Sequence, residues 1–509
     1  MLSGEIVKNK PFFYAKKCGD QIITKGIHRC FLGNKIPKRQ DRKSDGIFVE
    51  WQWERDRLTL WNDRYGIYPI YYCHKGDEIW ISPSIIKLIM EGAPTELDYN
   101  GLSVFLRMGF FIGEDTPFKS IRAVPPDTNF EWQNSKLKIS GSYFYGKTQS
   151  ISQDEAIDAY ISLFRQAIQR RLPKDENFVV PLSGGEDSRH ILLELCQLDY
   201  KPKYCVTARY YPPRPNLDEE IASELTKALG VKHVVLDQTD ARFKVELKKS
   251  IITNLCTYEH AWILVVADYL KGKSSTIYDG IGGDVLSRSD KTNPQRLSLF
   301  DSGCFSELAE GFLVTHSETA FLNLLTVEQY RKMNLDLAIH HLTEELIKHS
   351  NASDPVRSFR FWNNTRRNIA LSPYSLLSDN GNIVSPYLDY DLYDFLTSLP
   401  ASMILDHKFH IKTIRRAFPN YADILFEKER SAQTTDAREH NNQFAKALAW
   451  YIFTHSERPS RLMRHHYFIP RLMYCLVSRR YRETFWWLSP LILYLSQLEM
   501  VAGNKIMIN

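Results

Sequence analysis

The sequence predicts an α/β protein with two domains and a helical C-terminal region. Short apolar or alternating runs separated by turn residues occupy residues 1–146, which is typical of layered sheets. Strand-like and helix-like segments alternate in the early part of residues 152–430, which indicates a doubly wound parallel sheet with helices on both faces. Helical patterns dominate later and fill residues 431–509.

Composition limits the class of protein further. The 509 residues suffice for two to four domains, and a net charge of +5 is mild. There is no long basic run and no basic stripe with interleaved aromatics, so nucleic acid is not an expected partner. The eight cysteines lack C-x-x-C spacing and the start of the chain has no long apolar segment. We therefore expect a cytoplasmic protein with reduced thiols.

The first domain is expected to consist mainly of short strands. The expected strands are 47–53, 57–61, 68–73, 78–82, 129–139 and 143–145, and the expected helices are 84–90 and 102–108. The small and polar residues 146–152 mark the end of this domain.

Ser152 begins the second domain with a capping box, since Glu155 follows three residues later. The segments that follow are expected to be strands at 178–182, 204–207, 233–236 and 276–279 and helices after residue 188 and at 218–229. The segment 286–303 is rich in Ser, Asp and Arg, and we expect a mobile loop there.

The chemistry is concentrated in residues 183–188, S-G-G-E-D-S, which follow an apolar run ending at Leu182. Two adjacent glycines let the backbone N–H groups turn inward, and the following helix adds a positive dipole end, so the loop is expected to bind an anion. The hydroxyls of Ser183 and Ser188 can donate to phosphoryl oxygens, whereas Asp187 suits a phosphate site only with Mg²⁺ in between. The alternative is a solvated turn at a helix cap.

A second carboxylate reaches the same sheet edge if the strand ending near residue 278 lies beside the strand ending at Leu182. Asp284 would then join Asp187, and the two could share one Mg²⁺. A glycine turn capped by Asp284 is the alternative. The residues expected to bind a magnesium nucleotide are Leu182, Ser183, Gly184, Gly185, Asp187, Ser188, Thr207, Gly282 and Gly283, with Asp187 and Asp284 as metal ligands.

Several motifs, in the expected order, resemble those of known families. The loop 183–188 is similar to the PP-loop of ATP pyrophosphatases, which grips pyrophosphate as ATP is cut to AMP. The other matching segments, at 45–73, 117–130, 278–286, 385–400 and 410–418, resemble motifs of the asparagine synthetase family. The resemblance implies an α+β sandwich of the Ntn glutaminase type followed by an ATP-pyrophosphatase domain.

Departures from the family pattern limit what the resemblance implies. The family's glutaminase nucleophile is a cysteine at position 2, where this chain has Leu2. Cys18 and Cys30 cannot replace it, because the mechanism uses the free α-amino group of the same residue. We therefore expect a degenerate glutaminase domain that does not hydrolyse glutamine. Ile281 and Val285 replace two acids near the family's amino-acid substrate, so free aspartate is not the expected substrate.

The resemblance implies an ATP-dependent amide-forming synthetase. A substrate carboxylate attacks the α-phosphorus of ATP, pyrophosphate leaves, and an amine or ammonia then displaces AMP. The expected catalytic residues are Asp187, Asp284 and Lys428, with Arg430 as the rival of Lys428 for stabilising charge. Glu186 is expected to point away from phosphate, which its charge would repel. The expected partners are ATP, Mg²⁺, a small-molecule or peptide carboxylate, and an amine.

Alternative functions stay open. One is an intramolecular cyclase similar to β-lactam synthetases and lasso-peptide cyclases, favoured by Leu2, Ile281 and Val285. Another is a binding or scaffold protein, against which the retention of Asp187 and Asp284 counts. A tRNA-thiolating pyrophosphatase is disfavoured, because paired catalytic cysteines and a basic RNA face are lacking.

The most apolar stretch is 485–495, about half the length of a membrane-spanning helix. We expect no transmembrane segment there. A packed C-terminal helix and an interfacial helix are the two interpretations.

Overall fold

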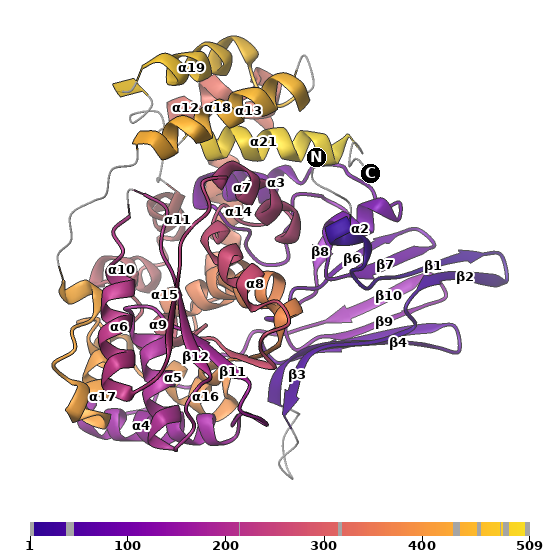
Figure 1. Ribbon diagram of the computed structural model, residues 1–509. Helices are drawn as coiled ribbons and strands as arrows, with labels where there is room; N and C mark the ends of the chain where they lie inside the picture. Colours follow the sequence, from indigo (N-terminus) through magenta and orange to yellow (C-terminus); the bar gives the residue numbers. More distant parts are fainter. Residues whose placement is uncertain are drawn as a thin grey trace.

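The structure, a computed structural model, describes residues 5–36, 45–212, 214–313, 318–430, 438–455, 460–478, 480–481 and 488–503. Figure 1 shows a β-sandwich on one side, a helix-flanked sheet beside it, and C-terminal helices across one end. Leu2, on which the expectation about glutamine depends, lies outside the described residues. Residues 431–437 and 485–487 lie outside them as well.

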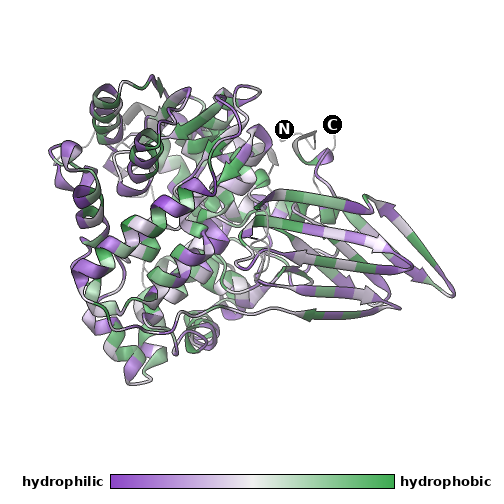
Figure 2. Ribbon diagram, turned by 90° about the horizontal axis from the view of Figure 1, so that it is seen from below, coloured by the Kyte–Doolittle hydropathy of each residue, from purple (hydrophilic) through white to green (hydrophobic). Residues whose placement is uncertain are grey.

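The N-terminal part is a sandwich of two antiparallel sheets, with strand orders β2-β1-β7-β6-β8 and β10-β9-β5-β4-β3. Its strands are β1 Phe13–Cys18, β2 Gln21–Gly26, β3 Arg29–Ile36, β4 Asp45–Glu54, β5 Arg57–Asn62, β6 Tyr71–Lys75, β7 Glu78–Ser82, β8 Ile121–Ala123, β9 Asn129–Gln133 and β10 Lys136–Ser140. Figure 2 shows hydrophobic and hydrophilic residues in turn along these strands. The inward side chains, including Trp51 and Trp132, form the core between the sheets.

The sandwich confirms the layered β architecture but corrects several expected elements. Three strands before residue 37 were not predicted, because β2 and β3 are largely exposed and lack a strong apolar pattern. The stretch 129–139 is a hairpin, turned at Asn134 and Ser135, which both have positive φ. Residues 143–145 form no strand. Instead, the Tyr143 hydroxyl donates to Glu345 and the Tyr145 hydroxyl to the Lys348 carbonyl.

The second part is built on a five-stranded parallel sheet of order β13-β12-β11-β14-β15. Its strands are β11 Phe178–Pro181, β12 Tyr204–Ala208, β13 His233–Leu236, β14 Thr276–Tyr278 and β15 Asn382–Val384. Helices α4 Gln153–Gln169, α5 Glu186–Gln197, α6 Leu217–Leu229 and α8 Leu264–Leu270 flank it, whereas α7 Arg242–Ile252 lies beyond the sheet, near the C-terminal helices. The Ser152 capping box is present at α4.

The strand order reverses between β11 and β14. The chain moves from β11 to β12 and β13, then returns to the other side of β11 for β14. Because such crossovers are right-handed, the helices before and after the reversal lie on opposite faces of the sheet. Phe178 pairs with Thr276 and Val179 with Ile277, so these two strands are neighbours, which is the condition for bringing Asp187 and Asp284 to one sheet edge. A ligand crevice is expected at such a switch point.

Helices then cover the sheet and the sandwich. They are α9 Gly283–Ser287, α10 Pro294–Asp301, α11 Phe305–Leu313, α12 Glu318–Leu324, α13 Val327–Lys332, α14 Leu335–Ile347, α15 Pro355–Phe359, the π-helix η2 Arg360–Ile369, a second π-helix η3 Ser372–Leu377, α16 Tyr390–Ser398 and α17 Phe409–Ala417. The prediction of a mobile loop at 286–303 was wrong for its second half, which forms α10. Asn293 caps α10 by accepting from the backbone N–H of Arg296, and Pro294 stands in its first turn, and both residues are typical of a helix start.

The C-terminal helices α18 Arg438–His455, α19 His465–Val477 and α21 Leu488–Ala502 pack together (Figure 1). Leu491, Ile492 and Leu495 of α21 are buried in a core shared with α3 Tyr99–Met108 and α2 Ile85–Met90 of the first domain. The described part of the apolar C-terminal stretch is therefore a packed helix. None of the helices in the described ranges has both the length and the apolar character that crossing a membrane requires.

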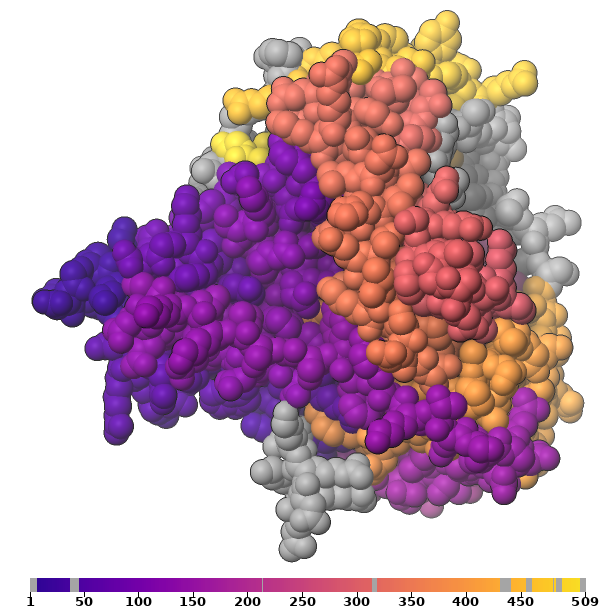
Figure 3. Space-filling model, turned by 180° about the vertical axis from the view of Figure 1, so that it is seen from behind, coloured from indigo at the N-terminus to yellow at the C-terminus, as the bar shows by residue number. Residues whose placement is uncertain are grey.

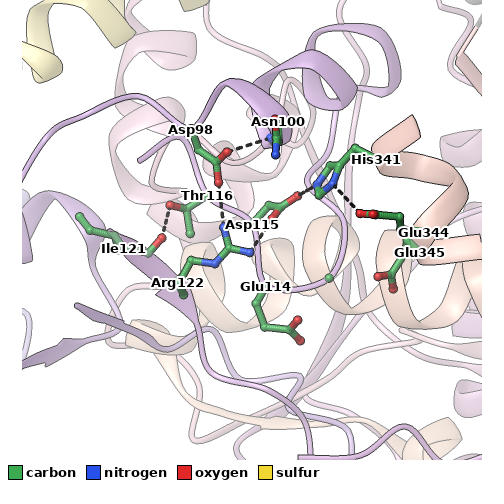
Figure 4. Close-up of polar contacts among 12 residues, drawn as sticks. Asp98, Asn100, Glu114, Asp115, Thr116, Ile121, Arg122, His341, Glu344 and Glu345 are labelled. Atoms are coloured by element: carbon green, nitrogen blue, oxygen red, sulfur yellow. Dashed lines mark hydrogen bonds and ion pairs between the residues drawn. The ribbon is translucent and has the colours of Figure 1, made fainter. Parts of the chain in front are cut away.

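The two halves form a close interface. Figure 3 shows the sandwich bordering directly on the residues of the second half. From η2, Arg366 donates to the Val124 carbonyl and Arg367 to the Asp115 carbonyl. Beside them, Arg122 donates to both Asp98 and Asp115, at 2.8 and 2.7 Å (Figure 4).

The polar cluster of Figure 4 also links α14 to the first half. His341 of α14 lies with Nε2 2.6 Å from Oδ2 of Asp115. Arg122 and His341 hold the pKa of Asp115 below its usual value despite its burial. In turn, the carboxylate of Asp115 raises the pKa of His341, although burial opposes it. We call Asp98, Asp115, Arg122 and His341 the interface cluster.

Candidate active site

A cavity of about 910 Å³ opens at the switch point, along the carboxyl ends of β11, β12 and β14. The loop after β11 contributes Ser183, Asp187 and Ser188 to its lining, and the turn after β14 contributes Gly282 and Asp284. The structure thus brings the two predicted motifs into one cavity. Leu182 and Thr207 line it as well, whereas Gly184, Gly185, Gly283 and Lys428 are not among its lining residues.

Asp187 and Asp284 lie side by side. The backbone N–H of Asp284 donates to Oδ2 of Asp187 at 3.1 Å. The Asp284 side chain is accessible from the cavity, yet the surrounding protein and the charge of Asp187 raise its pKa to about 6. Two carboxylates placed together in this way favour a shared cation, because each raises the free energy of ionising the other.

The glycines of the turn after β14 allow this close approach. A Cβ at Gly280 would lie 2.7 Å from the Cβ of Asp187, and one at Gly283 would lie 2.5 Å from its Cγ. Real Cβ atoms do not come that close, so only glycine fits at these two positions. The glycine-rich turn therefore holds the second carboxylate against the first.

The loop 183–188 is more self-contained than the sequence predicted. The Ser183 N–H donates to Oγ of Ser188, and the two hydroxyl oxygens lie 3.2 Å apart. The Gly184 N–H donates to the buried carboxylate of Asp218 at 2.5 Å. This N–H is thus not open to a ligand. The hydroxyls and the first-turn N–H groups of α5, which starts at Glu186, are the donors that face an anion.

Thr207 has a structural role in addition to its place in the lining. Its hydroxyl donates to the Leu182 carbonyl at 2.7 Å and contacts Nε2 of His233 at 2.8 Å. These contacts tie the end of β12 to the start of the loop. Thr207 therefore positions the loop that carries Ser183.

A group of buried side chains behind Asp187 was not predicted. His410 of α17 places Nδ1 3.4 Å from Oδ1 of Asp187, and its Nε2 lies 3.2 Å from both Nδ1 of His190 and the Tyr387 hydroxyl. That hydroxyl donates to the Asp187 carbonyl. Tyr387 lies inside the motif at 385–400 and His410 inside the motif at 410–418. Their place in these motifs is the sequence signal that could have identified them.

Glu186 does not share the cavity lining. It is buried and forms an ion pair with Arg288 at 3.0 Å. Burial would raise its pKa, but the charges of Arg288 and Lys428 help to lower it on balance. Its carboxylate is thus neutralised within the protein.

Lys428 and Arg430 differ in their surroundings. The short helix η8 Glu427–Glu429 lies against the loop, because the Glu427 N–H donates to the Gly184 carbonyl at 3.0 Å. Lys428 is exposed, and within the described chain it has no hydrogen bond or ion pair. Arg430 donates to Glu224 of α6 at 2.6 Å. Of these two cations, only Arg430 forms an ion pair in the described chain, whereas Lys428 acts on Glu186 through its charge alone.

The donor set fits a magnesium nucleotide. Oδ1 of Asp187 is buried without a hydrogen bond, and within the described ranges neither Asp187 nor Asp284 pairs with a lysine or arginine. Mg²⁺ suits one or two carboxylates completed by phosphate oxygens and water. The residues that would hold it are Asp187 and Asp284.

Fold and site together define a two-part α/β protein, a β-sandwich followed by a parallel-sheet domain with paired acids at its switch point. A family model described as a glutamine amidotransferase domain matches residues 34–144. The chain is 26% identical over 225 residues to asparagine synthetase [glutamine-hydrolyzing] 3 of Bacillus subtilis (strain 168), covering 38% of this chain and 35% of that protein. The relationship to asparagine synthetases that the motifs predicted is thus confirmed.

A second relative agrees with the first. Asparagine synthetase [glutamine-hydrolyzing] 1 of the same organism is 21% identical over 215 residues, covering 41% of this chain and 33% of that protein. The matched part of the chain spans about a third of the length of each of these relatives.

Solved structures give weaker likenesses. NMN synthetase from Francisella tularensis is 13% identical, covering 38% of this chain and 92% of that chain, with a TM-score of 0.19. Glutamine phosphoribosylpyrophosphate amidotransferase from B. subtilis is 10% identical, covering 39% and 58%, with a TM-score of 0.16. At such TM-scores these likenesses carry no weight for fold or function.

Proposed function

We propose that this protein is an ATP-dependent ligase that adenylates a carboxylate and transfers the acyl group to an amine. The observation that carries the proposal is the pair Asp187 and Asp284, held together in one cavity with no lysine or arginine ion pair among the described residues. A pure scaffold has no need of two such acids, whereas a magnesium nucleotide would neutralise them.

Each residue has a role in this reaction. Asp187 and Asp284 would hold the metal, and the hydroxyls of Ser183 and Ser188 with the first turn of α5 would bind phosphoryl oxygens. Bound Mg²⁺ would offset negative charge on the phosphates. Lys428, without an acidic partner beside the loop, stabilises charge that develops at the α-phosphorus.

The bonds change in two steps. A carboxylate oxygen of the substrate attacks the α-phosphorus of ATP, and the bond to the bridging oxygen breaks, which releases pyrophosphate. An amine nitrogen then attacks the activated carbonyl carbon, AMP leaves, and the nitrogen loses a proton to solvent. The cavity holds the reacting groups together, which lowers the entropic part of the barrier.

We further propose that the sandwich does not hydrolyse glutamine. Support comes from the cysteines described in it. Burial raises the pKa of Cys30 to about 11, and the pKa of Cys73 to about 12, so both thiols stay protonated and poorly nucleophilic. Cys18 lies exposed at the end of β1, outside the cavity lining.

The decisive experiment is ATP–pyrophosphate exchange with a panel of carboxylates, including peptides, with Asp187→Asn as the control. Exchange that depends on one carboxylate and vanishes in the control supports adenylation. No exchange with any of them would overturn the ligase and leave a binding protein. Glutamate release from glutamine by the pure protein would overturn the second proposal.

An intramolecular cyclase is a second candidate. Ile281 and Val285 line the cavity with aliphatic surface, where an acid would be needed for the ammonium group of a free amino acid. A cyclase joins an amine and a carboxylate of one molecule. Its product would be lighter than its substrate by one water, which mass spectrometry distinguishes from addition of a separate amine.

A further inference from the structure

Arg360 presents an unneutralised guanidinium to the cavity. It is the first residue of the π-helix η2, and its side chain is half-buried in the cavity lining. Across the described chain it has no hydrogen bond or ion pair, and its nearest aromatic contact is Phe110, with 6.0 Å between Cζ and the ring centre. Burial lowers its pKa, although Asp290 and Asp284 oppose that shift. A charge enclosed in this way favours an anionic ligand.

The other arginines near Arg360 are engaged. Arg357 donates to the Leu399 carbonyl, Arg366 to the Val124 carbonyl and Arg367 to the Asp115 carbonyl. Each is buried and serves the protein's own backbone. Arg360 lies among them in the chain and alone lacks such a partner. Its free charge is therefore not a general property of this helix.

Neighbouring groups add to the anion-binding character of this wall. Asn364 also lines the cavity, and its Oδ1 accepts from Asn368 at 3.1 Å, which leaves its amide N–H groups as donors. Arg296, which is not part of the cavity lining, is near enough to Arg360 for that charge to lower its pKa beyond the effect of burial, while Asp290 opposes the shift. π-helical segments frequently occur at functional sites.

We propose that Arg360 and the Asn364 amide bind a second anionic group, carboxylate or phosphate, of the acyl substrate. This inference rests on the proposed ligase and names its substrate class: a molecule with one carboxylate to be activated and another negative group to anchor it. The aliphatic surface of Ile281 and Val285 agrees, because it offers nothing to an ammonium group.

The test is a binding measurement that needs no turnover. Wild-type protein with Mg²⁺ and α,β-methylene-ATP is titrated calorimetrically with succinate, glutarate, adipate and 3-phosphopropionate, and with the monoamide or monoanion of each. We expect at least one dianion to bind about tenfold more tightly than its monoanion. Arg360→Gln should remove that preference, and Arg360→Lys should restore part of it.

Controls separate the possible anions. Arg416→Gln removes exposed ion pairs to Asp154 and Asp158 outside the cavity and should change nothing. Affinity for α,β-methylene-ATP should stay within about twofold in Arg360→Gln. Loss of nucleotide affinity instead would mean that Arg360 serves the nucleotide phosphates, and equal binding of dianions and monoanions would also overturn the proposal. If only the proposed ligase activity is wrong, ATP–pyrophosphate exchange will be absent while the preference for dianions remains.

Discussion

The aspartates of the interface cluster and those of the switch point differ in how the surrounding protein neutralises them. In the interface cluster, Arg122 bridges Asp98 and Asp115 and His341 adds a further bond (Figure 4). At the switch point, the backbone N–H of Asp284 joins it to Asp187, but neither acid has a lysine or arginine partner in the described ranges.

The difference separates charges that hold the fold from charges that await a ligand. A buried acid paired with a fixed base is strongly destabilised when the base is removed, since an unpaired charge remains. Burial and the neighbouring charge of Asp187 both raise the pKa of Asp284, and neither acid forms an ion pair with a lysine or arginine in the described ranges. Substitution should therefore affect stability at the interface cluster and activity at the switch point.

The largest expected effect is that of Asp187→Asn on activity. Removing one metal ligand should lower ATP–pyrophosphate exchange about 1,000-fold, on the order of 4 kcal/mol of transition-state stabilisation. The unfolding midpoint in urea should not fall, because repulsion with Asp284 is relieved. Asp423→Asn, an exposed acid outside the cavity lining, serves as the control. Equal activity of both variants would contradict the metal role.

Arg122→Ala should produce the converse result. It leaves Asp98 and Asp115 without their shared base, and we expect unfolding to become easier by about 3 kcal/mol, measured by urea denaturation. Nucleotide binding by the folded fraction should be unchanged. Arg57→Ala, whose ion pair with Glu131 is largely exposed, should cost less than about 1 kcal/mol. A loss of stability no greater than that of Arg57→Ala would end the contrast between the two pairs.

The same comparison, between a charge with an ion-pair partner and one without, can be made for the basic residues Arg430 and Lys428. Lys428→Ala should lower the exchange rate about 100-fold, because its charge has no acidic partner in the described chain and can serve the reaction. Arg430→Ala should change it less than about threefold, since its charge is already matched by Glu224. The reverse ranking would make Arg430 the stabilising base.

The smallest expected effect is the pH dependence of the interface cluster. The pKa of His341 is raised by Asp115, so the folded state binds this proton more tightly than the unfolded state. The stabilisation is complete below the ordinary histidine value of about 6.5 and is lost as pH rises through the folded pKa. His341→Gln should thus destabilise by about 2 kcal/mol at pH 6 and by less at pH 9, measured by urea unfolding. A pH-independent difference would argue against a charged His341.

Much of the site was predictable from local signals. The strand, the loop 183–188 and the following helix lie within one short stretch, and the glycine turn ending at Asp284 follows a predicted strand. The sequence could state the pairing of β11 with β14 only as a condition, and the structure meets that condition. The loop donor at Gly184 was misjudged, because its partner Asp218 is 34 positions away and lies at the start of another helix.

The sequence by itself determined which residues form the strands and turns at the site, because hydrophobic period and turn chemistry act over a few neighbouring residues. Tertiary structure alone decided which charges find partners: Arg122 between two acids, Arg430 against Glu224, and Arg360 free in the cavity. The separation of these partners in the chain ranges from 7 positions for Arg122 and Asp115 to 206 for Arg430 and Glu224, and only the folded path of the chain sets their distance.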